Sequence, residues 1–247
     1  MHIKTGYYEN AVGRVEFKKT GPVYMSKIDA SGAGVEAQSE ELIGAPGAVT
    51  MGLRAKSRVI PASFQFADIG YPMDRDFLAA VFSPLMSGTL VLHGELDDYA
   101  IDCRPQEAPS FVRDSGIDYL WDFDVNFIAD YPFFRRGAQR VATTSGTVFC
   151  KTVNGTPITI EYGAGEGGLF SLNGKQFTVT SGHERAIIID TKNMTITDDR
   201  GQPANDAIEN FWQAPLDGWG MNYGNNYLII SGGSPVVRWY ELALSVF

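Results

Sequence analysis

The amino-acid sequence predicts a mainly β protein with two parts, an N-terminal β domain that carries one short helix and a C-terminal jelly-roll β-sandwich. Hydrophobic residues make up 44% of the 247 residues, which is ample for well-filled cores. The 27 glycines and 12 prolines are spread along the chain and separate short segments. Many of these segments alternate apolar and polar residues, which is the pattern of strands with one buried face.

Alternating runs indicate the strands of the first half. The clearest one extends from Trp121 to Phe127, where large side chains at every second position share one face. Residues 89–96 alternate in the same way, and residues 101–103 continue as their hairpin partner after a turn. The other strand candidates of this half are 15–17, 23–28 and the long run 49–66.

One segment has the periodicity of a helix instead. Apolar residues recur at helical spacing between Phe77 and Phe82. Asp74 is a suitable N-cap, and Pro84 stands where the helix should stop. We therefore expect one short helix over residues 74–82, packed on a sheet.

Turn residues divide the second half into short strands. Asn154-Gly155 and Asn173-Gly174 are dipeptides typical of two-residue hairpin turns. Another hairpin is expected around residues 190–193. Closely spaced turns between short strands are typical of β-sandwiches and jelly rolls. The strand candidates of this half are 157–162, 169–172, 176–180, 186–190, 194–197, 227–231 and 236–244.

The charge and the cysteines limit the class of protein. The formal net charge is −9 and the sequence pI is about 4.8. General binding to nucleic-acid phosphates needs a basic surface and is therefore disfavoured. The first thirteen residues hold no apolar stretch of signal-peptide length, and no run approaches the length of a membrane span, so we expect neither. We expect Cys103 and Cys150 to be reduced core thiols, with a disulfide as the alternative.

The segment FIADYPFFRRG at 127–137 mixes aromatic and basic residues. Such interleaving can hold single-stranded nucleic acid, but a domain boundary is favoured in so acidic a chain. Pro132 has no amide hydrogen to donate and is expected to end a strand ladder. The predicted domains are residues 1–136 and 137–247.

The side chains around this boundary are candidate interface residues. We expect Phe133 and Phe134 to anchor the end of the first domain against the core or a neighbouring subunit. Arg135 and Arg136 are expected to begin a linker.

A glycine motif at Gly163–Gly168 matches G-x-G-x-x-G, the fingerprint of dinucleotide binding. That fingerprint needs a helix after the glycines, because the helix N-terminus holds the pyrophosphate. Here a strand-like run, residues 169–172, enters a tight turn instead. The motif therefore predicts a β-turn and no bound nucleotide.

Catalytic constellations are not evident. Three histidines, His2, His93 and His183, are too few and too separated to indicate a metal cluster or a triad. Asp122 and Asp124 are expected on the exposed face of a strand. Asp198-Asp199-Arg200-Gly201 lacks the spacing of a calcium loop and reads as a hairpin tip. We expect no enzyme activity, no cofactor and no metal.

The order of segments along nearly the whole chain resembles the distal tail (Dit) family of siphophage-type tails and related prophage particles. Each segment is weak alone, and the order and spacing carry the resemblance. The matching segments are the glycine-bracketed loop 41–47, the strand 58–66, the helix 74–82, the hairpin 88–104, the strand and Asp-Pro-aromatic ending 121–134, the hairpin 187–197 and the residues 211–212 and 224–230.

The resemblance implies a structural virion protein. In this family the N-terminal domain joins five copies in a six-membered ring, and a C-terminal galectin-like sandwich projects outward. The implied partners are other copies of the chain, the tail tube protein, the hub or tail-associated protein, and receptor-binding proteins as a further candidate. DNA would be passing cargo in the ring lumen. The implied location is the virion tail tip, after assembly in the cytoplasm of the host.

One segment departs from the family pattern. Residues 217–223 enlarge a turn that is expected to be short, and they add aromatic side chains. A carbohydrate-binding module that stacks Trp212, Trp219 and Tyr223 on sugars is the main alternative function. Trp219 and Tyr223 are therefore candidate glycan or interface contacts. A small hydrolase that uses paired carboxylates is the third class.

Overall fold

A computed structural model describes residues 5–31, 34–41, 48–68, 74–114, 116–209 and 219–246, with the side chains of 35–54 outside the description. The chain divides into two compact units. The N-terminal unit comprises residues 1–135 and 244–247, and the C-terminal unit comprises residues 136–243. Both consist of β-strands, apart from one α-helix and one 3-10 turn among the described residues.

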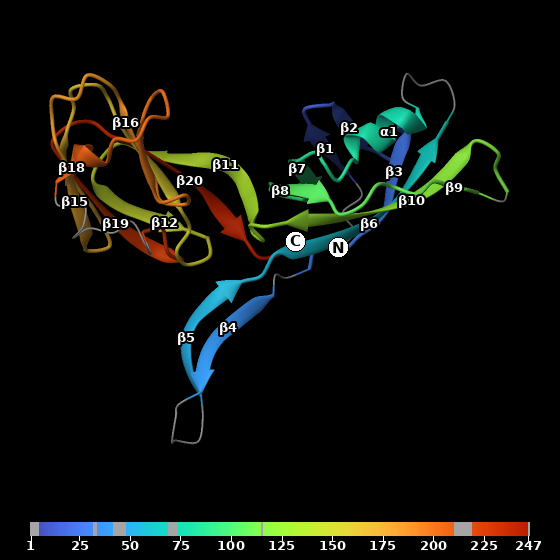
Figure 1. The fold of residues 1–247 in the computed structure, drawn as a ribbon, viewed down its shortest axis with the longest axis horizontal. Helices are drawn as coiled ribbons and strands as arrows, with labels where there is room; N and C mark the ends of the chain where they lie inside the picture. Colours follow the sequence, from blue (N-terminus) through green and yellow to red (C-terminus); the bar gives the residue numbers. More distant parts are fainter. Residues whose placement is uncertain are drawn as a thin grey trace. The chain divides into compact units, whose positions relative to one another are not determined.

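Seven strands of the N-terminal unit close into a barrel (Figure 1). Neighbouring strands pair antiparallel except β2 and β3, which pair in parallel. The pairing of β10 with β8 closes the circle. In order around the barrel, the strands are β1 (Gly6–Asn10), β2 (Arg14–Phe17), β3 (Val23–Ile28), β6 (Arg58–Ala67), β10 (Leu120–Ala129), β8 (Asp98–Pro105) and β7 (Gly88–His93).

Aromatic rings fill the barrel because alternate residues of each strand point inward. Phe82 lies at the centre of this core, with its ring centroid 5.6 Å from that of Tyr8 and 5.9 Å from that of Phe64. It also contacts Phe123 and Phe127, at 5.8 and 6.1 Å. All five side chains are 3% exposed or less.

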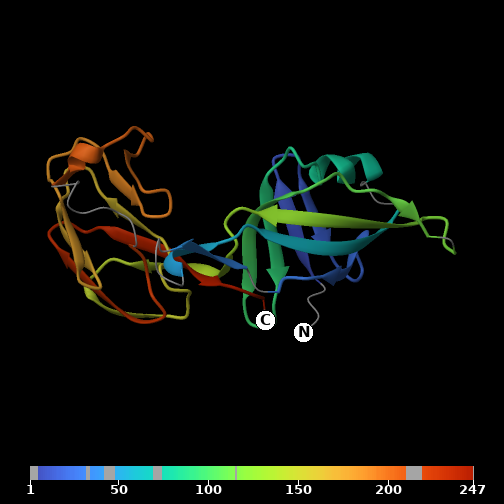
Figure 2. The ribbon, with the colours of Figure 1, turned by 60° about the horizontal axis from the view of Figure 1, so that its bottom comes forward.

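The helix α1 (Arg75–Val81) places Phe82 in this core from one end of the barrel (Figure 2). The Asp74 side chain accepts a hydrogen bond of 2.7 Å from the Phe77 amide, which confirms the predicted N-cap. Leu78 and Val81 are buried, so the apolar stripe of the helix faces the core as its spacing predicts.

Two further ladders belong to the N-terminal unit. β9 (Val112–Arg113) pairs with Trp121 and Asp122 near the start of β10. β4 (Val35–Glu41) and β5 (Ala48–Ala55) pair with each other and with no other described strand. The predicted long strand 49–66 is thus two strands, β5 and β6, which are separated at Lys56 and Ser57.

The C-terminal unit is a β-sandwich. One sheet has the order β12-β19-β14-β15-β18, and the other contains β17-β16-β13-β20. A core of buried side chains from both sheets, among them Ile160, Phe170 and Trp239, lies between them. The strands are β11 (Phe134–Ala142), β12 (Gly146–Cys150), β13 (Ile158–Tyr162), β14 (Gly168–Leu172), β15 (Lys175–Val179), β16 (Ile187–Asp190), β17 (Thr195–Asp198), β18 (Ile208–Glu209), β19 (Gly224–Ser231) and β20 (Val236–Ala243), with a 3-10 turn η1 (Asn205–Ala207).

Most of the predicted turns are in place, and one connects a different pair of strands. Asn173-Gly174 joins β14 to β15, and residues 191–194 join β16 to β17, both as hairpins. Asn154-Gly155 is a turn, but the prediction that it forms a hairpin is wrong. β12 pairs with β19 and β13 pairs with β16 and β20, so this turn carries the chain from one sheet to the other.

Candidate functional site

The segment 127–137 joins two strands directly. β10 ends at Ala129 and β11 begins at Phe134, so Arg135 and Arg136 lie inside a strand. The prediction that they begin a linker is therefore wrong. A short link over 130–133 is enough because the buried Phe134 starts the next strand at once.

Arg135 is held by an ion pair on the barrel surface. Its two terminal nitrogens donate to both carboxylate oxygens of Asp102, at 2.6 and 2.7 Å. Thr89 Oγ1 donates a third hydrogen bond of 3.0 Å to the same carboxylate. This bidentate geometry fixes the guanidinium in place. Arg135 therefore links β11 to β8, and its terminal nitrogens are bonded to a carboxylate of the protein itself.

Arg58 is buried next to Phe134 of the segment 127–137. It is 4% exposed, and its guanidinium lies 5.0 Å from the ring centroid of Phe134. Nη2 donates to the backbone oxygen of Leu244, whereas Nε and Nη1 have no acceptor among the described residues. Burial lowers the pKa of Arg58, and the carboxylate of Asp29 opposes that effect. The result is a cation that ties the chain segment after β20 to the barrel.

An open pocket of about 830 Å³ is lined by residues of the 130–133 link and of the 55–57 segment. Tyr131 and Phe133 make an edge-on contact in its wall, with ring centroids 5.2 Å apart. Burial raises the pKa of Tyr131 to about 12, so its hydroxyl stays protonated at neutral pH. The lining combines apolar and hydrogen-bonding groups and suits a docked side chain or loop. The lining residues are Ala55, Lys56, Ser57, Asp130, Tyr131, Pro132 and Phe133.

Trp219 and Tyr223 have different environments in the C-terminal unit. Trp219 is 5% exposed and packs against Phe177 and Phe170, with ring centroids 5.0 and 6.1 Å away. The hypothesis that Trp219 is an exposed sugar-stacking residue is therefore wrong, because its ring fills the sandwich core. Tyr223 is 68% exposed and remains accessible. Trp212 lies outside the described residues.

The glycine motif forms a turn and a strand, as predicted. Gly168 begins β14, and its backbone lies so close to the paired strand β19 that an added Cβ would stand 2.4 Å from the Ser231 oxygen. Gly167 is similarly tight against the backbone of Thr180. Close approach of backbones therefore explains these two glycines.

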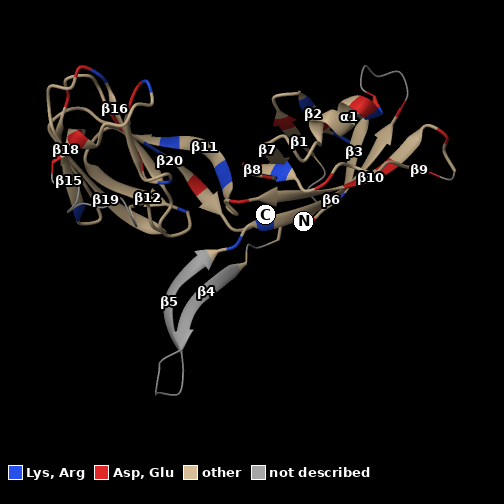
Figure 3. Ribbon diagram, viewed as in Figure 1, with Lys and Arg blue, Asp and Glu red and all other residues tan. Residues whose placement is uncertain are grey.

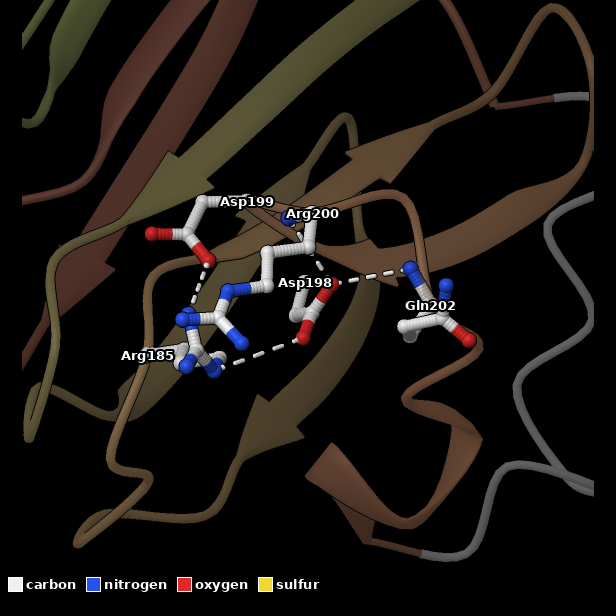
Figure 4. Close-up of polar contacts among 5 residues, drawn as sticks. All are labelled: Arg185, Asp198, Asp199, Arg200 and Gln202. Carbon is white, nitrogen blue, oxygen red and sulfur yellow. Dashed lines mark hydrogen bonds and ion pairs between the residues drawn. The ribbon is translucent and has the colours of Figure 1, made fainter.

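The acidic turn after β17 is held by its own backbone (Figure 4). Asp198 Oδ1 accepts hydrogen bonds from the amides of Arg200 and Gln202, at 2.9 and 2.8 Å. Arg185 pairs with Asp198 and Asp199, at 3.7 and 3.3 Å. These bonds hold the pKa of Asp198 below its usual value, and the backbone bond from Gln202 is the largest cause. The predicted hairpin tip is confirmed.

The histidines and cysteines have local roles. His93 Nδ1 lies 2.7 Å from Asp98 Oδ1 across the β7–β8 hairpin, and His183 contacts Thr180 at 2.7 Å. Cys103 and Cys150 are buried free thiols, as expected. Within the described ranges, no three acidic, histidine or cysteine side chains gather in the manner of a metal site. No helix in the same ranges is long and apolar enough to cross a membrane.

Sequence reasoning missed an exposed aromatic surface on the C-terminal unit. Phe149 and Tyr227 are 57% and 60% exposed. The available signal was the alternation in β19, where Tyr227 stands out of phase with the buried Asn226 and Leu228. Arg58 was also missed, because only the tertiary structure buries the start of β6.

The chain resembles solved phage tail and baseplate proteins. The crystal structure of the Dit protein of phage SPP1, described as a paradigm of the hub adsorption apparatus in phages infecting Gram-positive bacteria, matches with a TM-score of 0.64 and 16% identity over 90% of this chain and 94% of that one. A chain of the phage P2 baseplate in its activated conformation with calcium matches with a TM-score of 0.53 and 10% identity over 98% and 99% of the two chains.

No protein-family model matches the sequence, and no curated protein matches it. At such low identity the likeness establishes the fold. The chain has the β-rich fold of a Dit-type tail or baseplate component, and the expected fold class is confirmed at that level.

Proposed function

We propose that this protein is the distal tail component of a long, non-contractile phage or prophage tail. Six copies form a ring through their N-terminal units, join the tail tube to the hub, and leave a channel for DNA. The C-terminal units are free to contact neighbouring tail proteins, receptor-binding proteins among them. The role is that of a scaffold without catalysis, at the virion tail tip.

The observation that carries this proposal is the match to SPP1 Dit over 90% of the chain. A match over that share of the chain includes residues of both units, so it is not limited to a common sandwich. The P2 baseplate chain, which is similar over 98% of this chain, supports the same class of assembly.

The β4–β5 ladder gives a physical reason for assembly. Its strands have 7 and 8 residues and pair with no other described strand. Isolated two-stranded ladders are marginal in water, and open edges favour pairing with another chain. A neighbouring copy that covers the ladder would supply the missing burial. The open pocket beside Ala55 and Phe133 is a second surface suited to such a contact.

The acidic balance is compatible with a DNA conduit. A channel wall that shares the acidic balance of the chain, whose net charge is −9, would repel phosphates and not trap them. A reconstructed ring with a basic lumen would contradict this part of the proposal.

Native mass spectrometry and negative-stain imaging of the purified chain test the ring. We expect a species of six times the 27.0 kDa chain mass and six-fold particles. A chain that stays monomeric at high concentration, and also after mixing with tail tubes, would overturn the proposal.

A deletion tests the role of the ladder. Replacing residues 36–54 by a short Gly-Ser turn should abolish the ring while circular dichroism still shows a folded barrel, because no barrel strand pairs with β4 or β5. Leu85→Ser is the control, since this side chain is 91% exposed on the same unit. Rings that survive the deletion would exclude the ladder from the subunit contact.

A further inference from the structure

Three aromatic side chains are exposed on the outer face of the sheet that contains β12 and β19. Phe149, Tyr223 and Tyr227 are 57%, 68% and 60% exposed. Phe149 stands directly opposite Asn225, and Tyr227 is two residues further along the same strand. Because side chains alternate across a strand, Phe149 and Tyr227 share one face of the sheet. Large exposed rings that gather on one face mark a binding surface.

The backbone holds these rings in position. The centroids of Phe149 and Tyr223 are 6.2 Å apart in an edge-on contact. The Tyr223 amide donates a 2.9 Å hydrogen bond to Asn154 Oδ1, and the Tyr227 amide donates one of 2.9 Å to Asn173 Oδ1. These bonds fix the backbone that carries Tyr223 and Tyr227, so binding a ligand need not order that backbone.

Hydrogen-bonding groups lie between the rings. Asn225 stands opposite Phe149, and Thr147 stands opposite Tyr227. Both are exposed, and neither side chain has a hydrogen-bond partner among the described residues. The hydroxyls of Tyr223 and Tyr227 are likewise without a partner in the described part of the chain. The face therefore alternates aromatic rings with free amide and hydroxyl groups.

The segments that carry the rings contain no charged residue; the charged residues nearest in this sheet are Lys151 after β12, Lys175 on β15 (Lys175–Val179) and Glu209 on β18. Asp, Glu, Lys and Arg are absent from β12, β14 and β19 and from residues 219–223, although charged residues are 20% of the chain. Figure 3 shows β12 and β19 without acidic or basic positions. Within these segments an ionic ligand would find no counter-charge, whereas an uncharged ligand would not need one.

We propose that Phe149, Tyr223 and Tyr227, together with Thr147 and Asn225, bind an uncharged glycan. Hexose rings present apolar C–H faces that stack on aromatic side chains, and their hydroxyls bond to amide and hydroxyl groups at the rim. The centre of a protein interface is likewise rich in aromatic residues and poor in charged ones, so a tail protein that docks on this face is the competing outcome of the test. The proposal is independent of the ring, since it concerns the C-terminal unit alone.

Glycan-array screening and calorimetric titration of the full chain test the proposal. The array presents neutral and acidic oligosaccharides, and maltohexaose, cellohexaose and a galactotetraose serve as titration probes. We expect binding to at least one neutral oligosaccharide. Tyr227→Ala and Phe149→Ala should each weaken that binding by roughly tenfold, which corresponds to about 1.4 kcal/mol. Tyr119→Ala, which removes a 48% exposed ring from the N-terminal unit, should leave the affinity unchanged.

Three results would overturn the proposal. The first is no binding to any neutral glycan at millimolar concentration. The second is binding that is restricted to acidic glycans or is unaffected by both alanine variants. The third is self-association or binding to a tail protein that Tyr227→Ala abolishes in the absence of glycan binding, which would make the face a protein interface.

Discussion

The side-chain amide of Asn226 joins the two ends of the turn that carries Tyr223, and its replacement gives a sharp test of the C-terminal unit. Asn226 is fully buried. Its Nδ2 donates to the backbone oxygens of Asn222 and Gly224, at 2.8 and 3.2 Å. Its Oδ1 accepts from the Asn222 amide and from Asn173 Nδ2, at 2.8 and 2.9 Å. All four hydrogen-bonding positions of the side chain are therefore used.

Asn226→Asp keeps the shape of the side chain and removes both donors. Each lost hydrogen bond costs about 1 kcal/mol, and the buried carbonyls left without donors add ~1–3 kcal/mol. We therefore expect the free energy of unfolding to fall by roughly 3–5 kcal/mol at pH 7. Such a loss is large compared with the usual effect of a single substitution.

The pH dependence of this loss has a defined sign. The folded state disfavours a buried carboxylate that faces carbonyl oxygens, so the pKa of the new Asp is raised above its unfolded value of about 3.9. Folding then favours the protonated form, which restores one donor. The deficit relative to wild type is smallest below the unfolded pKa and grows as the pH rises through the folded pKa.

Urea unfolding followed by tryptophan emission measures this effect. A Trp121→Phe background leaves tryptophans only in residues 136–243, so the signal reports the C-terminal unit. Asn225→Asp is the matched control, because it makes the same change at the exposed neighbouring residue of β19. A loss below about 1 kcal/mol, a loss equal to that of the control, or a deficit that does not shrink in acid would refute the reasoning.

Three other predictions test the barrel core, a glycine contact and the acidic turn. Phe82→Ala should destabilise the N-terminal unit by about 3–5 kcal/mol in calorimetric or urea unfolding, because it leaves a cavity among four rings, whereas Leu85→Ala should change stability by less than ~0.5 kcal/mol. Gly168→Ala should lower the melting temperature much more than Gly165→Ala. Both glycines have a positive φ, but only a Cβ added at Gly168 would collide with the backbone of a neighbouring strand. Equal effects of the two substitutions would contradict this. Asp198→Ala should destabilise at pH 7, because the lowered pKa of Asp198 contributes stability that is complete above the unfolded-state pKa and is lost as the pH falls through the folded-state pKa; urea midpoints measured from pH 7 down into strong acid should therefore converge with those of wild type.

Local rules of the sequence predicted most of the individual elements. The alternation from Trp121 to Phe127 predicted β10, and the Asp74 cap with the apolar stripe to Phe82 predicted α1. Asn173-Gly174 predicted the β14–β15 hairpin. These features depend on contacts within a few residues, so periodicity and turn chemistry are sufficient to identify them.

The candidate sites were less accessible to such rules. Trp219 lies in an aromatic loop of the sequence but is buried against Phe177, and Tyr227 is exposed on a strand that also has a buried face. Arg135 looked like the start of a linker and instead lies in β11, where it pairs with Asp102 on the barrel surface. The partners of Trp219 and Arg135, which are Phe177 and Asp102, lie many residues away in the sequence.

The sequence by itself determined that the chain forms short strands with one apolar face, a single capped helix and tight turns, because these depend on neighbouring residues. Only the tertiary structure decided that the pairing of β10 with β8 closes a barrel and that Asn154-Gly155 crosses between two sheets. It alone also decided which aromatic rings fill a core and which remain exposed. Strand pairing and burial arise from contacts between distant segments, and a local pattern leaves several partners equally compatible.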